Sequence, residues 1–221
     1  DSVTEIEIGA FAGYRSLTSI VVAKGNKVYD SRNNCNAIIE TNTNRLIQGC
    51  ANTIIPKSVT MIESRAFYGC SQLASITIPN SVTEIGNIAF SGCETLISIT
   101  IPNLVTEIGD RTFEGCSALT GITIPNSVKE IGSSAFLSCY ALKNITIPDL
   151  VTEIGYRTFE GCWALTSITI PNSVKEIGGL AFNNCSALTS IYIPKSVEVI
   201  RGGVFKGCSA LTNINIHDSV S

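Results

Sequence analysis

The chain has 221 residues, of which 44% are hydrophobic and only 15% charged, and its formal net charge is −3. This length supports one sizeable core or two small ones. The slightly negative charge argues against a nucleic-acid-binding protein, and no apolar run approaches the roughly 18 residues that cross a membrane. The single histidine, His217, leaves no imidazole in the body of the chain for a metal cluster or a Ser-His or Cys-His nucleophile.

Three residue types recur with a period of 23 residues, which indicates a repeat protein whose units stack on their neighbours. The prolines of this ladder are Pro56, Pro79, Pro102, Pro125, Pro148, Pro171 and Pro194. The phenylalanines are Phe67, Phe90, Phe113, Phe136, Phe159, Phe182 and Phe205, and a cysteine follows each of them three residues later. Residues 96–118 match residues 142–164 at 18 of 23 positions, which indicates duplication of a block of two units.

The two ends of the chain fall inside units. Residues 2–6 begin in the middle of a unit and have neither the basic start nor the apolar stretch of a signal peptide. The chain stops soon after the predicted strand 214–216. Because solenoids usually end in polar capping units, we expect a single repeat domain, residues 1–221 with about nine repeats, that is a fragment or mature domain of a longer protein.

Residues 24–55 interrupt the period, because the unit that ends at Pro56 is ten residues too long. Two short apolar runs, 37–39 and 46–47, flank a polar stretch, which predicts an inserted β-hairpin turning at residues 42–44 on the convex side. The insert is either a decorated repeat that alters curvature or a dedicated binding loop. Cys35 and Cys50, the only cysteines outside the ladder, are the one pair open to a disulfide.

Each regular unit predicts a strand followed by a helical turn, as residues 119–141 illustrate. Residues 119–124 place apolar side chains in alternation with a polar one, and Pro125 ends the strand because it cannot donate to a ladder. Gly132 permits a turn, and apolar residues at steps of three over 135–142 form one face of a short helix or 3-10 turn. Units this short must stack into an α/β solenoid with parallel strands about 4.8 Å apart.

The unit L-x-x-I-x-I-P-x-S-V-x-x-I-G-x-x-A-F-x-x-C resembles the BspA-like class of leucine-rich repeat, found in surface proteins of anaerobic bacteria and some protozoa. The resemblance implies a right-handed curved horseshoe, with a parallel β-sheet on the concave side and short helical or 3-10 turns on the convex side. It also implies an extracellular, cell-surface location and adhesive binding. Unlike general leucine-rich repeats, this chain has no asparagine column after the strand, and serine or leucine takes that slot.

Two ladders are interpreted as structural. The cysteine column shares the period of the core residues, so we expect free buried thiols, and no spacing suits a zinc site. A carboxylate column is interpreted as a solvated face, with weak divalent-cation binding as the alternative. Its members are Glu84, Glu107, Glu130, Glu153 and Glu176.

The outward positions of the strands form the candidate ligand-binding surface on the expected concave face. They are Thr77, Thr100, Thr123, Asn144, Thr146, Thr169, Tyr192, Asn213 and Asn215. Tyr192 is the natural anchor because aromatic residues dominate binding energy at interfaces. The alternatives are that threonine simply suits a strand and, much less favoured, that the face binds ice. Trp163 and Tyr140 are expected on the rim or the convex side.

These patterns predict a non-catalytic adhesion module, a monomer that binds a protein or glycan partner on a host or neighbouring cell. No glycine-rich phosphate loop, metal-ligand cluster or catalytic constellation is found, so we expect no cofactor, no metal and no nucleic-acid partner. The alternative is a structural spacer array in a longer surface protein whose binding is carried elsewhere.

Overall fold

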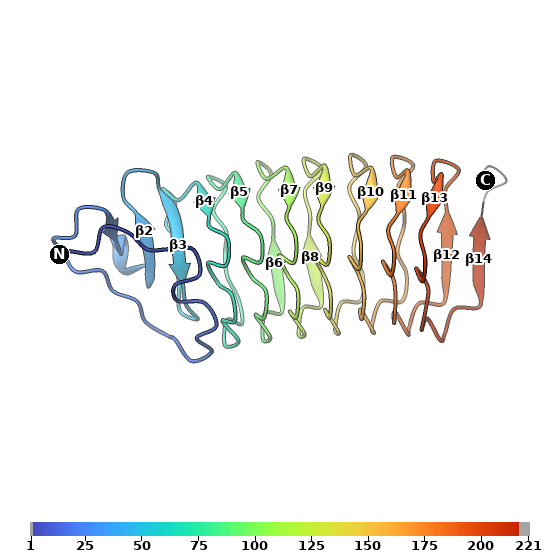
Figure 1. Ribbon diagram of the computed structural model, residues 1–221, viewed down its shortest axis with the longest axis horizontal. Coiled ribbons are helices and arrows are strands. Elements are labelled where there is room, and N and C mark those ends of the chain that lie inside the picture. The colour runs from blue at the N-terminus through green and yellow to red at the C-terminus, as the bar shows by residue number, and fades with distance from the viewer. Residues whose placement is uncertain (1, 217–221) are drawn as a thin grey trace.

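The computed structural model describes residues 2–216, so His217 lies outside the described residues. Figure 1 shows successive turns stacked along the long axis in a nearly straight row, rather than the curved horseshoe that the resemblance implies. The elements of this part of the chain are β1 (Tyr29–Asp30), η1 (Arg32–Asn34), β2 (Ala37–Glu40), β3 (Arg45–Gly49), β4 (Met61–Ile62), β5 (Glu84–Ile85), β6 (Ser98–Thr100), β7 (Glu107–Ile108), β8 (Gly121–Thr123), β9 (Glu130–Ile131), β10 (Glu153–Ile154), β11 (Glu176–Ile177), β12 (Ser190–Ile193), β13 (Val199–Ile200) and β14 (Asn213–Ile216).

The strands form two parallel columns, of which the sequence predicted one. The predicted column holds β6 paired with β8, β12 paired with β14, and an isolated parallel bridge between Thr146 and Thr169. The second column consists of two-residue strands, with β4–β5, β7–β9 and β10–β11–β13 paired in parallel. Most of these strands consist of one exposed and one buried residue, as Glu130 and Ile131 of β9 show.

The helical turn predicted over residues 135–142 and its equivalents is wrong. The N–H groups of Ser134, Phe136 and Ser138 donate to carbonyls of the next turn at 2.8–2.9 Å, so the backbone bonds between turns instead of along a helix. Ser134 and Ser138 have φ angles of 57° and 60°, which no right-handed helix accommodates. Only single local turns remain, such as the bond from Cys139 N–H to the Phe136 carbonyl at 3.2 Å. Among the described residues the one helical element is η1, which lies in the insert.

The core is a stack of phenylalanine rings beside a column of free thiols. Neighbouring rings from Phe67 to Phe205 lie 5.0–5.9 Å apart between centroids and within 10° of parallel. From Cys93 to Cys208, each thiol donates to the carbonyl of the phenylalanine in the preceding turn, at 3.1–3.4 Å. All nine cysteines are free and buried, which confirms the thiol column and shows that Cys35 and Cys50 are not bridged.

The insert forms an antiparallel hairpin of β2 and β3, with a register shift between Ile38 and Ile39. The hairpin does not project from a convex side as expected. It continues one of the sheets instead, because β3 pairs in parallel with β4 and β1 pairs with β2 at the outer edge. Figure 1 shows β2 and β3 at the N-terminal end of the row, next to β4. The insert therefore covers this end of the core.

The first unit, before the insert, is not stacked into the core. Residues 2–28 contain no strand, and Val3, Ile8 and Val21 are exposed. Phe11, the phenylalanine outside the ladder, is also exposed and takes no part in the ring stack. A bond from Gly13 N–H to the Tyr68 carbonyl, at 2.9 Å, repeats the bond from Gly69 N–H to the Ser91 carbonyl, so the segment continues the backbone bonding between turns at this point.

Candidate functional site

The nine predicted binding residues lie on one column of strands, here called the threonine face. All nine side chains are exposed. On strands such as β6 and β12 they alternate with buried isoleucines, Ile99 and Ile191 among them, whereas on the terminal strand β14 the isoleucines are exposed as well. The pairing places Thr100 beside Thr123, Thr146 beside Thr169, and Tyr192 beside Asn215. The face is therefore a row of exposed polar side chains, with Tyr192 and Asn215 at its C-terminal end.

A shallow hollow of about 530 Å³ lies in the middle of the threonine face. It brings together four of the nine predicted residues: Thr100, Thr123, Asn144 and Thr146. Gly121 creates much of the depth, since a Cβ atom added there would meet no other atom within 4 Å. Ser98 and Thr120 complete the polar lining. Every side chain around the hollow is uncharged, so it offers hydroxyl and amide groups for hydrogen bonding.

The other predicted residues lie outside this hollow. Thr77 lines a separate hollow of about 520 Å³ beside Ile54, next to the insert. Tyr192, Asn213 and Asn215 lie on β12 and β14 at the C-terminal end of the row. Sequence reasoning placed Gly121 in the strand but did not include it among the binding residues, because the pattern gives no signal that a missing side chain opens a depression.

Trp163 and Tyr140 stack on each other at the surface. Their ring centroids are 4.1 Å apart with an interplanar angle of 19°, and the side chains are 52% and 38% exposed. Their positions differ by 23 residues, so the stack follows directly from the period. Part of each ring is covered by the other, which provides a packing role for both aromatic residues.

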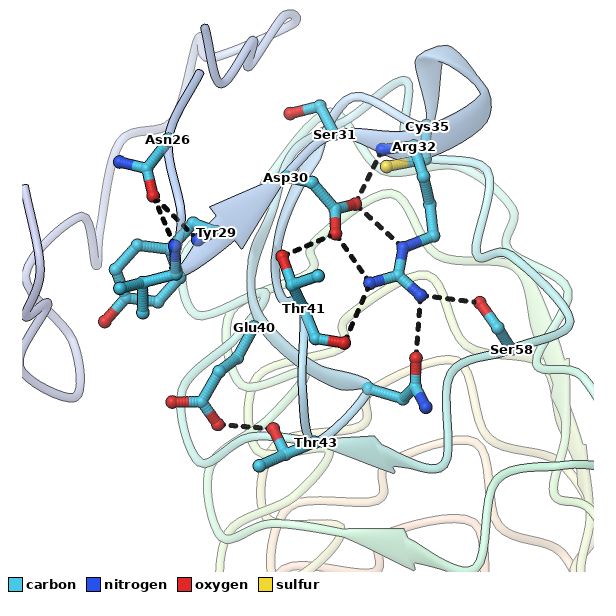
Figure 2. Close-up of polar contacts among 12 residues, drawn as sticks. Asn26, Tyr29, Asp30, Ser31, Arg32, Cys35, Glu40, Thr41, Thr43 and Ser58 are labelled. Carbon is cyan, nitrogen blue, oxygen red and sulfur yellow. Dashed lines mark hydrogen bonds and ion pairs between the residues drawn. The ribbon is translucent and has the colours of Figure 1, made fainter. Parts of the chain in front are cut away.

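The polar side chains of the insert form hydrogen bonds and ion pairs with one another, as Figure 2 shows. The Asp30 carboxylate accepts bonds from the Arg32 guanidinium at 2.6 and 2.8 Å and from the Thr41 hydroxyl at 2.8 Å. The Arg32 guanidinium lowers the pKa of Asp30 from its ordinary value. Arg32 also donates to Asn44 at 2.7 Å and to Ser58 at 3.3 Å, which fastens the hairpin turn to the next unit. The saturation of these groups favours a structural role for this network.

The glutamate column forms the surface of the two-residue strands. Burial raises the pKa of Glu107, and the nearby charges of Glu130 and Glu84 raise it further. At the C-terminal end Glu176 is paired with Arg201, with 2.6 Å between Oε1 and Nε. Residues 2–216 contain no group of three or more histidine, cysteine or acidic side chains that could hold a metal ion.

The BspA type leucine-rich repeat family matches residues 37–162 and 106–221, in six copies. The two matched segments overlap and together cover most of the chain. This chain belongs to the BspA type leucine-rich repeat family. The stacked parallel turns and the 23-residue ladders are the structural basis of that membership. No helix in the described part of this family member is long and apolar enough to span a membrane.

Solved structures of bacterial leucine-rich repeat proteins share this fold. A protein from Bacteroides ovatus is 40% identical over 73% of this chain and 42% of its own, with a TM-score of 0.71. A leucine-rich cell surface protein from Faecalibacterium prausnitzii is 36% identical over 72% of this chain and 52% of its own, with a TM-score of 0.57. A protein from Eubacterium ventriosum is 28% identical over 100% of this chain and 59% of its own, with a TM-score of 0.85.

In each of these three comparisons the match spans about half of the solved protein, from 42% to 59% of its length. A search of curated proteins found no match to this chain. The comparisons therefore establish the family and the fold of this BspA type protein.

Proposed function

We propose that this BspA type chain is a non-catalytic recognition module of a cell surface, which binds a protein or glycan partner through the threonine face. The observation that carries the proposal is the hollow at Gly121, a depression of about 530 Å³ in an otherwise regular row of side chains. A plain scaffold needs no such depression. The similarity to a Faecalibacterium protein described as a cell surface protein supports the location.

The chemistry of the hollow suits a polar, uncharged group of the partner. Thr100, Thr123 and Thr146 offer hydroxyl groups that both donate and accept, and Asn144 adds an amide. Short side chains on a strand lose little conformational entropy on binding, because their backbone is already fixed. Tyr192 is 54% exposed on the same face and extends the surface toward the C-terminal end.

The test fills the hollow without disturbing the core. In Gly121→Trp the new side chain enters open space, so the fold should be retained while the hollow is lost. Gly202→Trp is the matched control, because a Cβ atom there also meets nothing within 4 Å and the residue lies in a turn away from the threonine face. We first identify ligands of the wild-type chain on arrays of glycans and matrix proteins, then measure the Kd for each variant.

We expect Gly121→Trp to weaken binding at least tenfold and Gly202→Trp to leave it unchanged, with identical circular dichroism spectra. Unchanged binding in Gly121→Trp would remove the hollow from the recognition surface. If the wild-type chain binds nothing while a longer protein containing it does, the chain acts instead as a structural spacer. The near identity of alternate units is the observation that favours this second role.

A further inference from the structure

A second groove lies on a different part of the surface, where the turns meet the N-terminal segment. Its volume is about 610 Å³. One wall comes from Ala12, Gly13 and Arg15 of the first unit, and the rest comes from three successive regular turns. Gly13 N–H bonds to the Tyr68 carbonyl just as Gly69 N–H bonds to the Ser91 carbonyl one turn later, so the first unit extends the stack along this wall of the groove.

The floor of the groove is backbone. Gly69, Gly92 and Gly115 occupy the same slot in consecutive turns, with φ angles of 70–73°. A side chain is not forbidden in this slot, since Ser138 and Asn184 occupy its equivalents at φ 60°. A Cβ atom on Gly69 would lie 2.7 Å from the Cα atom of Gly13, and one on Gly92 would lie 3.3 Å from the Cα atom of Gly69, so the glycines allow the turns to approach closely. The floor of the groove therefore carries no side chains.

The charge of the groove is positive. Three arginines but only two carboxylates line it. Arg15 pairs with Glu94 at 3.4 Å, and Arg111 lies 3.9 Å from Glu114, at the limit of an ion pair. Arg65 forms no ion pair with any carboxylate of residues 2–216, and its Cδ atom packs near Gly9. An exposed guanidinium therefore faces solvent at this site, with a fork of donors suited to carboxylate or sulfate.

The hydroxyl of Ser91 is available to a ligand in the groove. Ser91 lines the groove and is only 5% exposed. Its hydroxyl forms no hydrogen bond with any residue that the structure describes, whereas hydroxyls in other units, such as Ser127 and Ser173, donate to a backbone carbonyl at 2.6–2.7 Å. The Ser91 hydroxyl oxygen is reached by solvent in the groove, so it is available to bond a group of a ligand bound there.

We propose that this groove binds an acidic polysaccharide, with Arg65 and Arg111 holding its carboxylate or sulfate groups and Ser91 bonding a sugar hydroxyl. Arg65 and Arg111 come from turns separated by one other, so their backbones lie about 10 Å apart, two inter-strand spacings. That distance suits anionic groups repeated along a chain. The exposed Tyr68 ring provides a flat surface for a sugar, and the glycine floor offers no side-chain pockets of the kind that a peptide would fill.

The test measures binding of heparin, hyaluronan, polyglutamate and dextran by calorimetry at 0.15 M salt. Arg65→Gln/Arg111→Gln is compared with Lys129→Gln/Lys206→Gln, which removes the same charge from exposed lysines outside the groove. We expect heparin or hyaluronan to bind the wild-type chain, the arginine variant to lose at least tenfold in affinity, and the lysine variant to lose less than twofold. Equal losses would show nonspecific charge attraction and overturn the site.

Ser91→Ala separates a binding role from a structural one. Because the hydroxyl has no partner in the protein, its removal should leave the unfolding midpoint unchanged or raise it, while affinity for the polysaccharide falls about threefold. A lower midpoint with unchanged affinity would contradict the role given to Ser91. Tighter binding of polyglutamate than of either polysaccharide, or no binding of any polyanion, would overturn the proposal and leave the threonine face unaffected.

Discussion

The cysteine column shows how one residue type serves both packing and hydrogen bonding. Each thiol is small enough to lie beside the phenylalanine stack and can donate to a carbonyl of the preceding turn, as Cys139 does to Phe113 at 3.2 Å. The Phe113 carbonyl also accepts the Cys116 N–H at 3.1 Å, so the thiol is its second donor and links two successive turns. Burial raises the pKa of Cys116 and of Cys70 to about 12, so both remain protonated at neutral pH. The column therefore acts as uncharged core.

The raised pKa values predict a loss of stability at alkaline pH. An unfolded thiol ionises near pH 8.5, whereas the folded Cys116 thiol ionises near pH 12. The thiol's contribution to stability is therefore complete below pH 8.5 or so and declines by about 1.4 kcal/mol per pH unit between these two values. Urea denaturation from pH 7 to 11 measures this slope. Cys116→Ala, which titrates one thiol fewer, should show a shallower decline, and a flat profile to pH 11 would contradict the assignment.

At the scale of elements, the insert replaces a unit of the stack with a hairpin. Its buried residues Ala37, Ile39 and Leu46 cover the N-terminal end of the core, and Gly49 lies flat on the first ring of the stack. A Cβ atom on Gly49 would lie 2.1 Å from Cε1 of Phe67, so no other residue fits without movement. The Arg32 network holds the hairpin to the following unit (Figure 2). The insert therefore works as an end cap.

Gly49→Ala tests this capping contact. The added methyl group must displace the Phe67 ring, which we expect to lower the free energy of unfolding by about 1–3 kcal/mol. Gly121→Ala is the control, because it adds the same group to a strand with open space around it. Chemical denaturation of both variants gives the comparison. Equal stability of the two variants would mean that the hairpin does not pack on the stack as described.

At the scale of the whole molecule, stability rests on contacts between neighbouring turns. Each interior ring of the phenylalanine stack contacts one ring before it and one after it, and the backbone of each turn bonds to the next. A solenoid of this kind behaves as a row of units coupled to nearest neighbours. An interior turn contacts a neighbouring turn on both sides. The last turn, which contains Phe205, contacts a neighbouring turn on one side, and the Phe205 ring is only half-buried.

Truncation of one ring should therefore cost more in the middle of the row than at its end. We expect Phe113→Ala to lower the free energy of unfolding by about 3–5 kcal/mol. Phe205→Ala should cost less than half of that, because its ring is partly exposed and has one ring neighbour. Urea denaturation monitored by circular dichroism measures both. Equal costs would contradict the nearest-neighbour description and indicate coupling along the whole row.

The features that the sequence predicted are those repeated in every unit. Three ladders predicted the stacking of the units, a buried thiol column and one column of parallel strands. They are the ladders of Phe113, Cys116 and Pro125 and their equivalents. The helical turn was wrong because spacing at steps of three also fits successive turns broken by left-handed residues such as Ser134. The second strand column was missed because a strand of two residues is too short to give a pattern.

The candidate sites depend on residues that depart from the repeated pattern. The row of threonines was visible in the sequence, but the hollow in it is created by the absence of a side chain at Gly121. The second groove brings Arg15 next to Arg65 and Arg111, although the insert separates Arg15 from the others along the chain.

The sequence alone determined the family, the stacking and the composition of the core, because a 23-residue period forces equivalent residues of successive turns into contact. Only the tertiary structure decided where the insert lies, which surfaces are hollow and which polar groups lack partners. These properties depend on contacts between the irregular residues 2–55 and the regular turns, and periodicity carries no information about segments that occur once.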